Sequence, residues 1–222
     1  MTEQGSKYDQ LFYPYLFEGE KTSREAVIDQ VRHSTLEKCH EIVALRQQLF
    51  QDAGELIIAA GQAMARAFAS GATLFAFGNG GSTTDAQDLV TELIHPPYAH
   101  WRPLPAVALT NDIAVITAIG NDVGFASIFT RQLIALGQPG DIAVGISTSG
   151  NSTNILQAIE QAKKQGLLTV ALSGYDGGKI AHSPATDFCI TAPSDHIPRI
   201  QEAQASAYHA LLAIIQALLA AP

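Results

Sequence analysis

Cysteine and charge are both scarce in this chain. Its 222 residues include only two cysteines, Cys39 and Cys189, which lie far apart and form no C-x-x-C motif. This usage is typical of free thiols in a cytosolic protein and does not indicate a disulfide framework. The N-terminal residues lack the basic-then-apolar order of a signal peptide, and no apolar run reaches the ~18 residues that a membrane span needs. We therefore expect a cytoplasmic protein without a membrane partner.

Basic residues are also few. The chain has 13 Lys and Arg against 21 Asp and Glu, a net charge of −8, and no basic run. Nucleic-acid binding depends on clustered Lys and Arg, so direct binding of DNA or RNA is not expected. An acidic protein that binds an anion must use local donors, chiefly backbone N–H groups at helix starts. Only 15% of the residues are charged and 47% are hydrophobic, which favours burial of surface between identical subunits.

The chain falls into an N-terminal part and an alternating part. Residues 1–24 mix polar and aromatic residues around "FYPYLF" and are expected to form an irregular arm. Apolar residues at helical spacing continue to about Ala69, which predicts one long helix, or two helices with a break near residues 51–54. We assign residues 1–35 to the arm and the start of this helix, and residues 36–222 to the main domain.

After Gly71, short apolar runs alternate with helical stretches. The runs are "ATLFAFG", "LPAVAL", "DIAVGIS", "LTVALSG" and "DFCITAP", and helices are expected over residues 84–93, 125–135, 153–165 and 198–220. Strands that alternate with helices predict an α/β fold, with a parallel five-stranded sheet and helices on both of its faces. In such folds ligands bind at the carboxyl ends of the strands.

Two strand ends run into loops of small polar residues, "GNGGSTTDA" at residues 78–86 and "ISTSGNSTNIL" at residues 146–156. Glycine allows a turn and the close approach of a ligand, while a helix start supplies free N–H groups and the positive end of the helix dipole. A phosphate group carries a charge of about −1.5 to −2 and three acceptor oxygens, so it suits such loops.

Either loop could instead be an ordinary strand-to-helix connection in which one Ser or Thr caps the helix. The hydroxyl residues of "STSGNS" exceed what one cap needs, which favours phosphate binding. Neither loop matches G-x-x-x-x-G-K-[ST] or G-x-G-x-x-G, so an NTPase or a dinucleotide site is not supported.

Two helices carry further polar candidates. Asp88 and Glu92 are four residues apart and share a helix face, either as a solvated face or as a candidate metal site with Glu92 as a general base. Gln201 and His209 lie near one stripe of the last helix. A lone His in an apolar helix is more often a satisfied core residue, but Gln201 and His209 together need polar partners, which a cleft would provide.

These segments together resemble the sugar isomerase (SIS) fold and are most similar to the phosphoheptose isomerases. The resemblance rests on "FGNGGSTTDAQDLVTELI", "ALTNDIAVITAIGNDVGFASIFTRQL", "PGDIAVGISTSGNSTNILQAIEQAKKQG", "TVALSGYDGGKIA" and "RIQEAQASAYH", and it covers about residues 40–220. It implies an enzyme that interconverts sedoheptulose 7-phosphate and glycero-manno-heptose 7-phosphate. It also implies homotetramers whose sites are built from more than one subunit.

The resemblance assigns a role to each matching position. Glu92 and His209 would be catalytic. The substrate would be bound by a Gly-rich loop, an Asn-Asp pair, a serine loop and the last helix, through Asn79, Gly80, Gly81, Ser82, Asn121, Asp122, Ser147, Thr148, Ser149, Ser152 and Gln201.

Many members of this family bind zinc with a His, the Glu, the Gln and the second His of these helices. In this chain Asp88 replaces the first His. An aspartate oxygen can still bind zinc, so the implied zinc ligands are Asp88, Glu92, Gln201 and His209.

The implied reaction moves a carbonyl between C1 and C2 through an enediolate, with Glu92 as the base at carbon and His209 as the acid/base at oxygen. One alternative is a non-catalytic sugar-phosphate-binding regulator or partner-binding subunit with the same fold. Asp88 and the N-terminal arm favour that alternative, and the retention of Glu92 and His209 opposes it. Another alternative is an isomerase of a different phosphosugar.

The loop "HPPYAHWRP" contains His95, His100 and Trp101. Loops carry both binding residues and interface residues, so these side chains either touch the substrate or lie between subunits. We favour the subunit interface.

Overall fold

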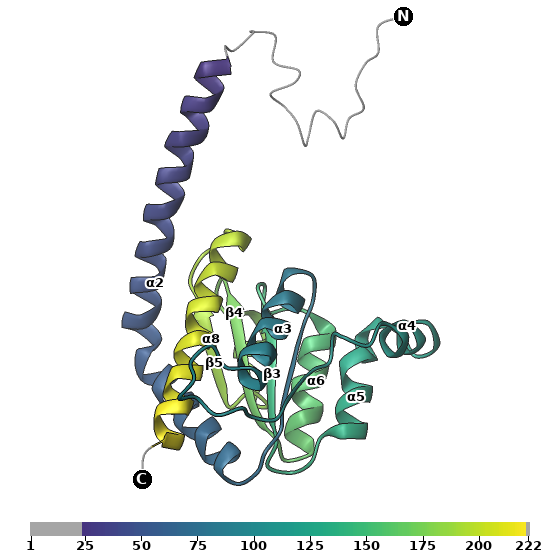
Figure 1. The fold of residues 1–222 in the computed structure, drawn as a ribbon. Helices are drawn as coiled ribbons and strands as arrows, with labels where there is room; N and C mark the ends of the chain where they lie inside the picture. The colour runs from purple at the N-terminus through teal and green to yellow at the C-terminus, as the bar shows by residue number, and fades with distance from the viewer. Residues whose placement is uncertain (1–23, 221–222) are drawn as a thin grey trace, which may run out of the picture. The chain divides into compact units, whose positions relative to one another are not determined.

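The computed structural model describes residues 24–220 and contains a parallel five-stranded sheet with helices on both of its faces (Figure 1). The strands lie in the order β2-β1-β3-β4-β5, and all four neighbouring pairs are parallel. Their bounds are β1 (Leu74–Gly78), β2 (Ala106–Ala108), β3 (Ile142–Ser147), β4 (Leu168–Gly174) and β5 (Phe188–Ala192). The predicted α/β fold is confirmed.

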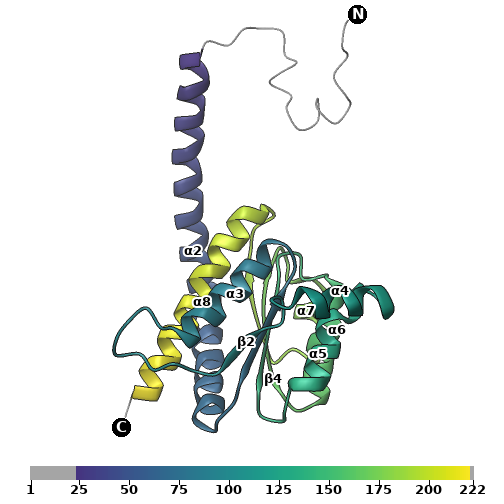
Figure 2. The same ribbon diagram turned by 45° about the vertical axis from the view of Figure 1, so that its right-hand side comes forward.

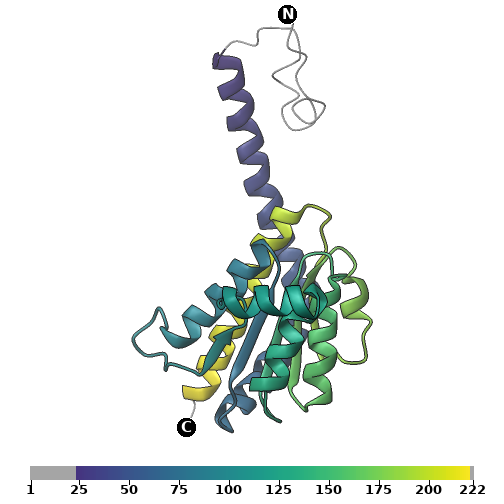
Figure 3. The same ribbon diagram turned by 90° about the vertical axis from the view of Figure 1, so that its right-hand side faces the viewer.

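Two layers of helices cover this sheet, as Figures 2 and 3 show from two further sides. One layer contains the later part of α2 (Arg24–Ala69), α3 (Gly81–Ile94) and α8 (Ile197–Ala220). The other contains the short 3₁₀ helix η2 (Phe125–Ser127), α5 (Ile128–Leu136), α6 (Thr153–Lys164) and α7 (Gly178–Ala181). Helix α4 (Ile113–Asp122) packs beside α5 and η2.

Each face of the sheet has its own apolar core because successive side chains of a strand point to opposite faces. In β1, Leu74 and Ala76 belong to the core shared with α2, α3 and α8. Phe75 and Phe77 of the same strand belong to the core shared with α5 and α6. All residues of β1 and β3 are buried, as expected for strands of a parallel sheet that is covered on both sides.

Three of the longer helical segments differ from the predicted ones, and the four-residue α7 was not predicted. Helix α3 begins at Gly81, three residues before the predicted start, because Gly80 adopts φ 56° and turns the chain directly into the helix. The predicted helix over residues 125–135 consists of η2 followed by α5. Helix α4 was not among the predicted helices, although Asp112 caps it by accepting a 3.0 Å hydrogen bond from the Val115 N–H.

Helix α2 extends over Arg24–Ala69, so the predicted long helix is continuous and has no break at residues 51–54. The chain divides into two compact units after His40. In the described part of the first unit, apolar side chains such as Val27, Val31 and Leu36 are exposed. The predicted arm lies mostly outside the described residues, and the predicted domain boundary at residue 35 stays a prediction.

Helix α8 is the one helix within residues 24–220 that is long and apolar enough to cross a membrane. Its residues Ile200, Ala203, Ala207, Leu211 and Ile215 are fully or almost fully buried in the core that it shares with α2 and α3. Packing inside the fold thus buries 44% of the apolar window of this helix.

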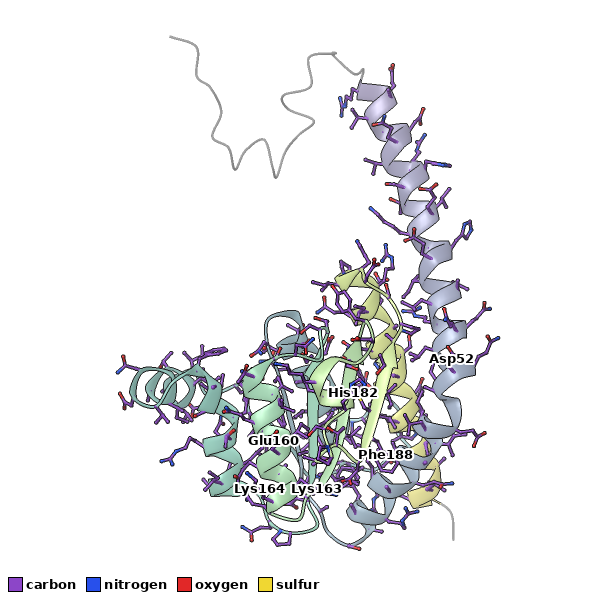
Figure 4. The ribbon with its side chains drawn as sticks, turned by 180° about the vertical axis from the view of Figure 1, so that it is seen from behind. Asp52, Glu160, Lys163, Lys164, His182 and Phe188 are labelled. Atoms are coloured by element: carbon purple, nitrogen blue, oxygen red, sulfur yellow. The ribbon has the colours of Figure 1, made fainter. Side chains whose placement is uncertain are left out.

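Asp187 joins α6 to the start of β5, at the end of the sheet where Figure 4 labels Lys163 and Phe188. Lys163 of α6 donates to Asp187 Oδ1, and Asp187 Oδ2 accepts from both the N–H and the hydroxyl of Thr169, each at 3.0 Å. Burial alone would raise the pKa of Asp187. The hydrogen bonds from Lys163 and Thr169 outweigh it and hold this pKa below its usual value.

A lowered pKa means that Asp187 stabilises the fold at pH values above the pKa that it has in the unfolded chain, and that this contribution is lost as the pH falls through the folded value. We predict that Asp187→Asn lowers the free energy of unfolding by about 1–3 kcal/mol at pH 7, since it removes a charged acceptor of three hydrogen bonds. The difference from wild type should shrink as the pH falls below 4.

Urea denaturation at a series of pH values measures this effect. Asp52→Asn, on the later part of α2, is the control, because the structure gives no ion pair for Asp52 among the described residues. A loss of stability in Asp187→Asn that is equal at pH 7 and below pH 4 would contradict the prediction.

Candidate active site

The two polar loops lie side by side at the point where the strand order reverses. From β1 the chain passes to β2 on one side and then to β3 on the other, and in open α/β sheets ligands bind outside the carboxyl ends of the strands at such a point. Asn79 follows β1, and Asn154 lies in the first turn of α6. Their side-chain amides donate to each other in two hydrogen bonds, both 2.8 Å long. This amide pair fixes the two loops relative to each other.

The serine at the start of α6 does not cap this helix with its hydroxyl group. Ser152 is the N-cap residue of α6, yet its side chain makes no capping hydrogen bond in the described chain. Its Oγ instead lies 3.0 Å from the Oγ of Ser147, which is 4% exposed at the end of β3. Thr148 and Ser149 follow, both partly buried. The loop therefore presents a cluster of hydroxyl groups at the start of α6, which is a suitable place for an anion.

The serine loop rests directly on the turn after β4. Gly150 has φ 62°, and a side chain there would place its Cβ 2.0 Å from the Gly177 carbonyl oxygen. Asn151 reinforces this contact, because its side chain donates to the Ser149 carbonyl at 2.8 Å and accepts from the Lys179 N–H at 3.1 Å. The serine loop is thus fixed against the turn after β4 at two adjacent residues, Gly150 and Asn151.

The Gly-rich loop turns at Gly80 and leads straight into α3. Ser82, in the first turn, is 4% exposed. Gly81 lies against the last helix, since a Cβ at Gly81 would come within 2.0 Å of the Gln201 Nε2 atom. The structure therefore places Gln201 of α8 in contact with the Gly-rich loop.

Further along the same two helices, two acids meet the histidine. The Nε2 atom of His209 lies 3.2 Å from Oε1 of Glu92 and 3.9 Å from Oδ2 of Asp88. The Glu92 side chain is 24% exposed, while those of Asp88 and His209 are about half exposed. The predicted association of Asp88 and Glu92 with the helix-borne His209 is therefore present in the fold.

Two residues around this group were not predicted. Tyr208 is 3% exposed and donates a 2.6 Å hydrogen bond from its hydroxyl to Asp88 Oδ2. Burial and then this bond raise the pKa of Tyr208 far above its usual value, so the phenol stays protonated.

Asp85 lies one turn before Asp88, and its Oδ2 is buried without a hydrogen-bond partner among the described residues. Burial, followed by the charge of Asp88, raises the pKa of Asp85 to about 6.

The donor atoms of Asp88, Glu92 and His209 could hold a metal ion, since one atom from each lies within 4.8 Å of the others. Tetrahedral zinc with bonds of about 2.0–2.1 Å needs neighbouring ligands about 3.4 Å apart. The observed 3.2 Å and 3.9 Å are close to that spacing. Two carboxylates and one imidazole also suit a divalent ion chemically, so these residues fit a metal site.

The predicted site residues are not all gathered within one chain. Gln201 is eight residues before His209 on α8, which corresponds to a rise of about 12 Å along the helix. Asn121 and Asp122 end α4, where they are exposed and where the Asn121 amide donates to Asp122 Oδ1 at 2.8 Å. Helix α4 packs beside α5 and η2, on the other layer of the fold from Glu92 and His209.

The fold and the polar crevice define the class of protein. Residues 39–174 match the family model of the SIS domain. The phosphoheptose isomerase of Solidesulfovibrio magneticus is 43% identical over 175 residues, which are 79% of this chain and 84% of the relative. That of Geotalea daltonii is 43% identical over 177 residues, which are 80% of this chain and 91% of the relative.

A solved structure gives the same result. The phosphoheptose isomerase of Neisseria gonorrhoeae superposes with a TM-score of 0.78 at 35% identity, over 84% of this chain and 99% of that protein. The chain therefore belongs to the phosphoheptose isomerase family of SIS-domain proteins.

The sequence gives little indication of the site residues that were not predicted. Tyr208 lies on the apolar stripe of α8 with Ala207 and Leu211, so its spacing indicates a core residue. Asn154 stands inside "GNSTN", where an Asn is typical of a helix start. Its partner Asn79 is 75 residues away, and only the folded chain reveals the pairing.

We predict that Gly150→Ala weakens binding of a phosphorylated ligand at least tenfold, because the added methyl group would collide with the Gly177 carbonyl and displace the serine loop. Isothermal titration calorimetry with sedoheptulose 7-phosphate measures the affinity. Gly54→Ala is the matched control, since a Cβ at Gly54 has no neighbouring atom within 4 Å among the described residues. Equal affinities in the two variants would show that the loop does not depend on this contact.

Proposed function

We propose that the protein is an aldose–ketose isomerase of a phosphosugar, with sedoheptulose 7-phosphate and glycero-manno-heptose 7-phosphate as substrate and product. The 3.2 Å contact between Glu92 and His209 carries this proposal, because it pairs a carboxylate base with an imidazole acid/base. Family membership supports the choice of sugar. The presence of this pair opposes the alternative of a non-catalytic regulator.

The phosphate group is proposed to bind at the serine loop, through Ser147, Thr148, Ser149 and Ser152. The hydroxyl groups there and the start of α6 offer donors without a basic side chain. Binding of this remote group supplies energy that orients the reacting carbons. The Gly-rich loop (Asn79, Gly80, Gly81 and Ser82) and Gln201 are proposed to contact the sugar.

The reacting carbons are proposed to lie against Glu92 and His209. Glu92 removes the proton from the carbon next to the carbonyl, and the same carboxyl group returns it to the neighbouring carbon. His209 exchanges a proton with the oxygens, so the carbonyl moves between C1 and C2 through an enediolate. The buried part of the Glu92 carboxylate and its contact with the imidazole keep these two groups at a fixed spacing.

A zinc ion is the proposed cofactor, held by Asp88, Glu92 and His209. The family resemblance also implies Gln201 as a ligand; in this chain Gln201 lies about 12 Å from His209 along α8 and is assigned to the sugar. When bound, the ion would stabilise negative charge that develops on the sugar oxygens. Asp88 contributes a charged oxygen where the family resemblance implies a neutral imidazole in many members, which favours retention of a divalent cation.

A homotetramer with composite sites is part of the same proposal. Helix α4 is apolar, yet none of its residues is buried within the described chain, and Ile113 is 72% exposed. Asn121 and Asp122 at the end of α4 would serve the site of a neighbouring subunit, which explains their distance from Glu92 in one chain. A cytoplasmic location, without nucleic-acid or membrane partners, belongs to this proposal.

We predict that Glu92→Gln abolishes exchange of the substrate's carbon-bound hydrogen with solvent, because an amide cannot accept the proton. In heavy water, proton NMR of sedoheptulose 7-phosphate measures this exchange directly. His209→Ala should slow turnover at least 100-fold, within the range for loss of a general acid/base. Persistent exchange in Glu92→Gln would rule out the assigned base.

Binding of sedoheptulose 7-phosphate to Glu92→Gln should stay within a few-fold of wild type, since the serine loop is unchanged. Glu160→Gln, on the outer layer at α6, is the control for removal of a surface carboxylate and should exchange normally (Figure 4).

For the metal, we predict about one zinc ion per wild-type chain after purification without chelators, and much less in Asp88→Ala, which loses one of three charged or imidazole ligands. Elemental analysis by mass spectrometry measures the content. Activity that survives chelator treatment in a metal-free wild-type protein would remove zinc from the proposal.

A further inference from the structure

The bond between Tyr208 and Asp88 is the shortest link between α3 and α8 in the candidate site. The phenol donates to Asp88 Oδ2 at 2.6 Å, and the tyrosine ring packs on the His209 ring with 4.6 Å between centroids. Tyr208 is almost fully buried, whereas the Asp88 side chain is 51% exposed. A rigid donor from the core therefore holds an acid that would otherwise move freely at the surface.

We propose that Tyr208 is a positioning residue that holds the Asp88 carboxylate in place as a one-oxygen ligand of a divalent metal ion. The inference rests on the metal site of the proposed function and adds to it a residue that touches neither the ion nor the sugar.

The charges around Asp88 show why it needs to be held. Asp85 and Glu92 lie one turn away on either side, so three acids follow one another along α3, and like charges at this spacing repel. A hydrogen bond from a phenol to a carboxylate opposes this repulsion without adding a positive charge that would compete with a cation.

One oxygen of Asp88 takes part in both contacts. The phenol donates to one lone pair of Oδ2, and Oδ2 is also the Asp88 oxygen that lies 3.9 Å from His209 Nε2. The remaining lone-pair positions of Oδ2 are available to an ion, and a carboxylate fixed through this oxygen favours one-oxygen binding. Partners of this kind, which hydrogen-bond a ligating group, typically change metal affinity by about 10–100-fold when removed.

If Tyr208 had only a structural role, its aromatic ring would be sufficient and its hydroxyl group would not be needed. The ring fills the core beside Ala207 and Leu211, and phenylalanine would fill it equally well. Tyr208→Phe therefore separates the two roles, since it removes the hydroxyl and keeps the ring on His209.

The test is the affinity of the purified full-length protein for Zn²⁺ alone, measured by competition with a chromogenic chelator. Tyr208→Phe should bind Zn²⁺ about 10–100-fold more weakly than wild type. The visible spectrum of the Co²⁺-substituted protein should also change, because the freed carboxylate alters the coordination geometry. Tyr98→Phe, which removes a hydroxyl from a 55% exposed tyrosine, is the control and should match wild type in both measurements.

Thermal melting followed by circular dichroism should give similar midpoints for the three proteins, which excludes a general loss of folding as the cause. Wild-type affinity and an unchanged Co²⁺ spectrum in Tyr208→Phe would overturn the inference. So would a wild-type protein that isomerises sedoheptulose 7-phosphate but binds no ion, and that result would leave the proposed isomerase function standing. Tyr208-dependent Zn²⁺ binding in a protein without isomerase activity would support the inference and reject the proposed function.

Discussion

The packing of α3 against α8 on one face of the sheet decides which polar side chains meet. Leu89 and Leu93 of α3 and Ala207 and Leu211 of α8 are buried in one core. Their positions fix how far each helix is rotated about its axis. Residues next to these apolar stripes then lie along the line where α3 and α8 meet. There Glu92 of α3 faces the imidazole of His209 of α8. The chemistry of the site is thus a consequence of hydrophobic packing, since no charged pair is required to orient the helices.

The reversal of strand order between β1 and β3 supplies the second half of the site. It places two loops without basic side chains next to each other, so an anion bound there must be recognised by hydroxyl groups and backbone N–H groups. This is consistent with the acidic character of the chain as a whole.

The sheet was predictable from the sequence because each strand is an apolar run bounded by glycine or polar residues, and β4 begins and ends at the predicted residues. Helix α4 was not, since an apolar segment without a polar face has no helical periodicity to detect. For the site, spacing and family resemblance indicated Glu92 and His209. Tyr208 escaped detection because its ring satisfies the pattern of a core residue, and only the distance to Asp88 reveals what its hydroxyl does.

The reciprocal amide pair of Asn79 and Asn154 has a consequence for how pH acts on this protein. Neither side chain titrates, and the two amides are joined by two hydrogen bonds of equal length. Acidification that adds protons to the carboxylates and the imidazole therefore leaves the spacing between the two loops unchanged. A pH–rate profile would therefore report the protonation of the α3–α8 edge together with the second ionisation of the substrate's phosphate, which has a pKa of about 6.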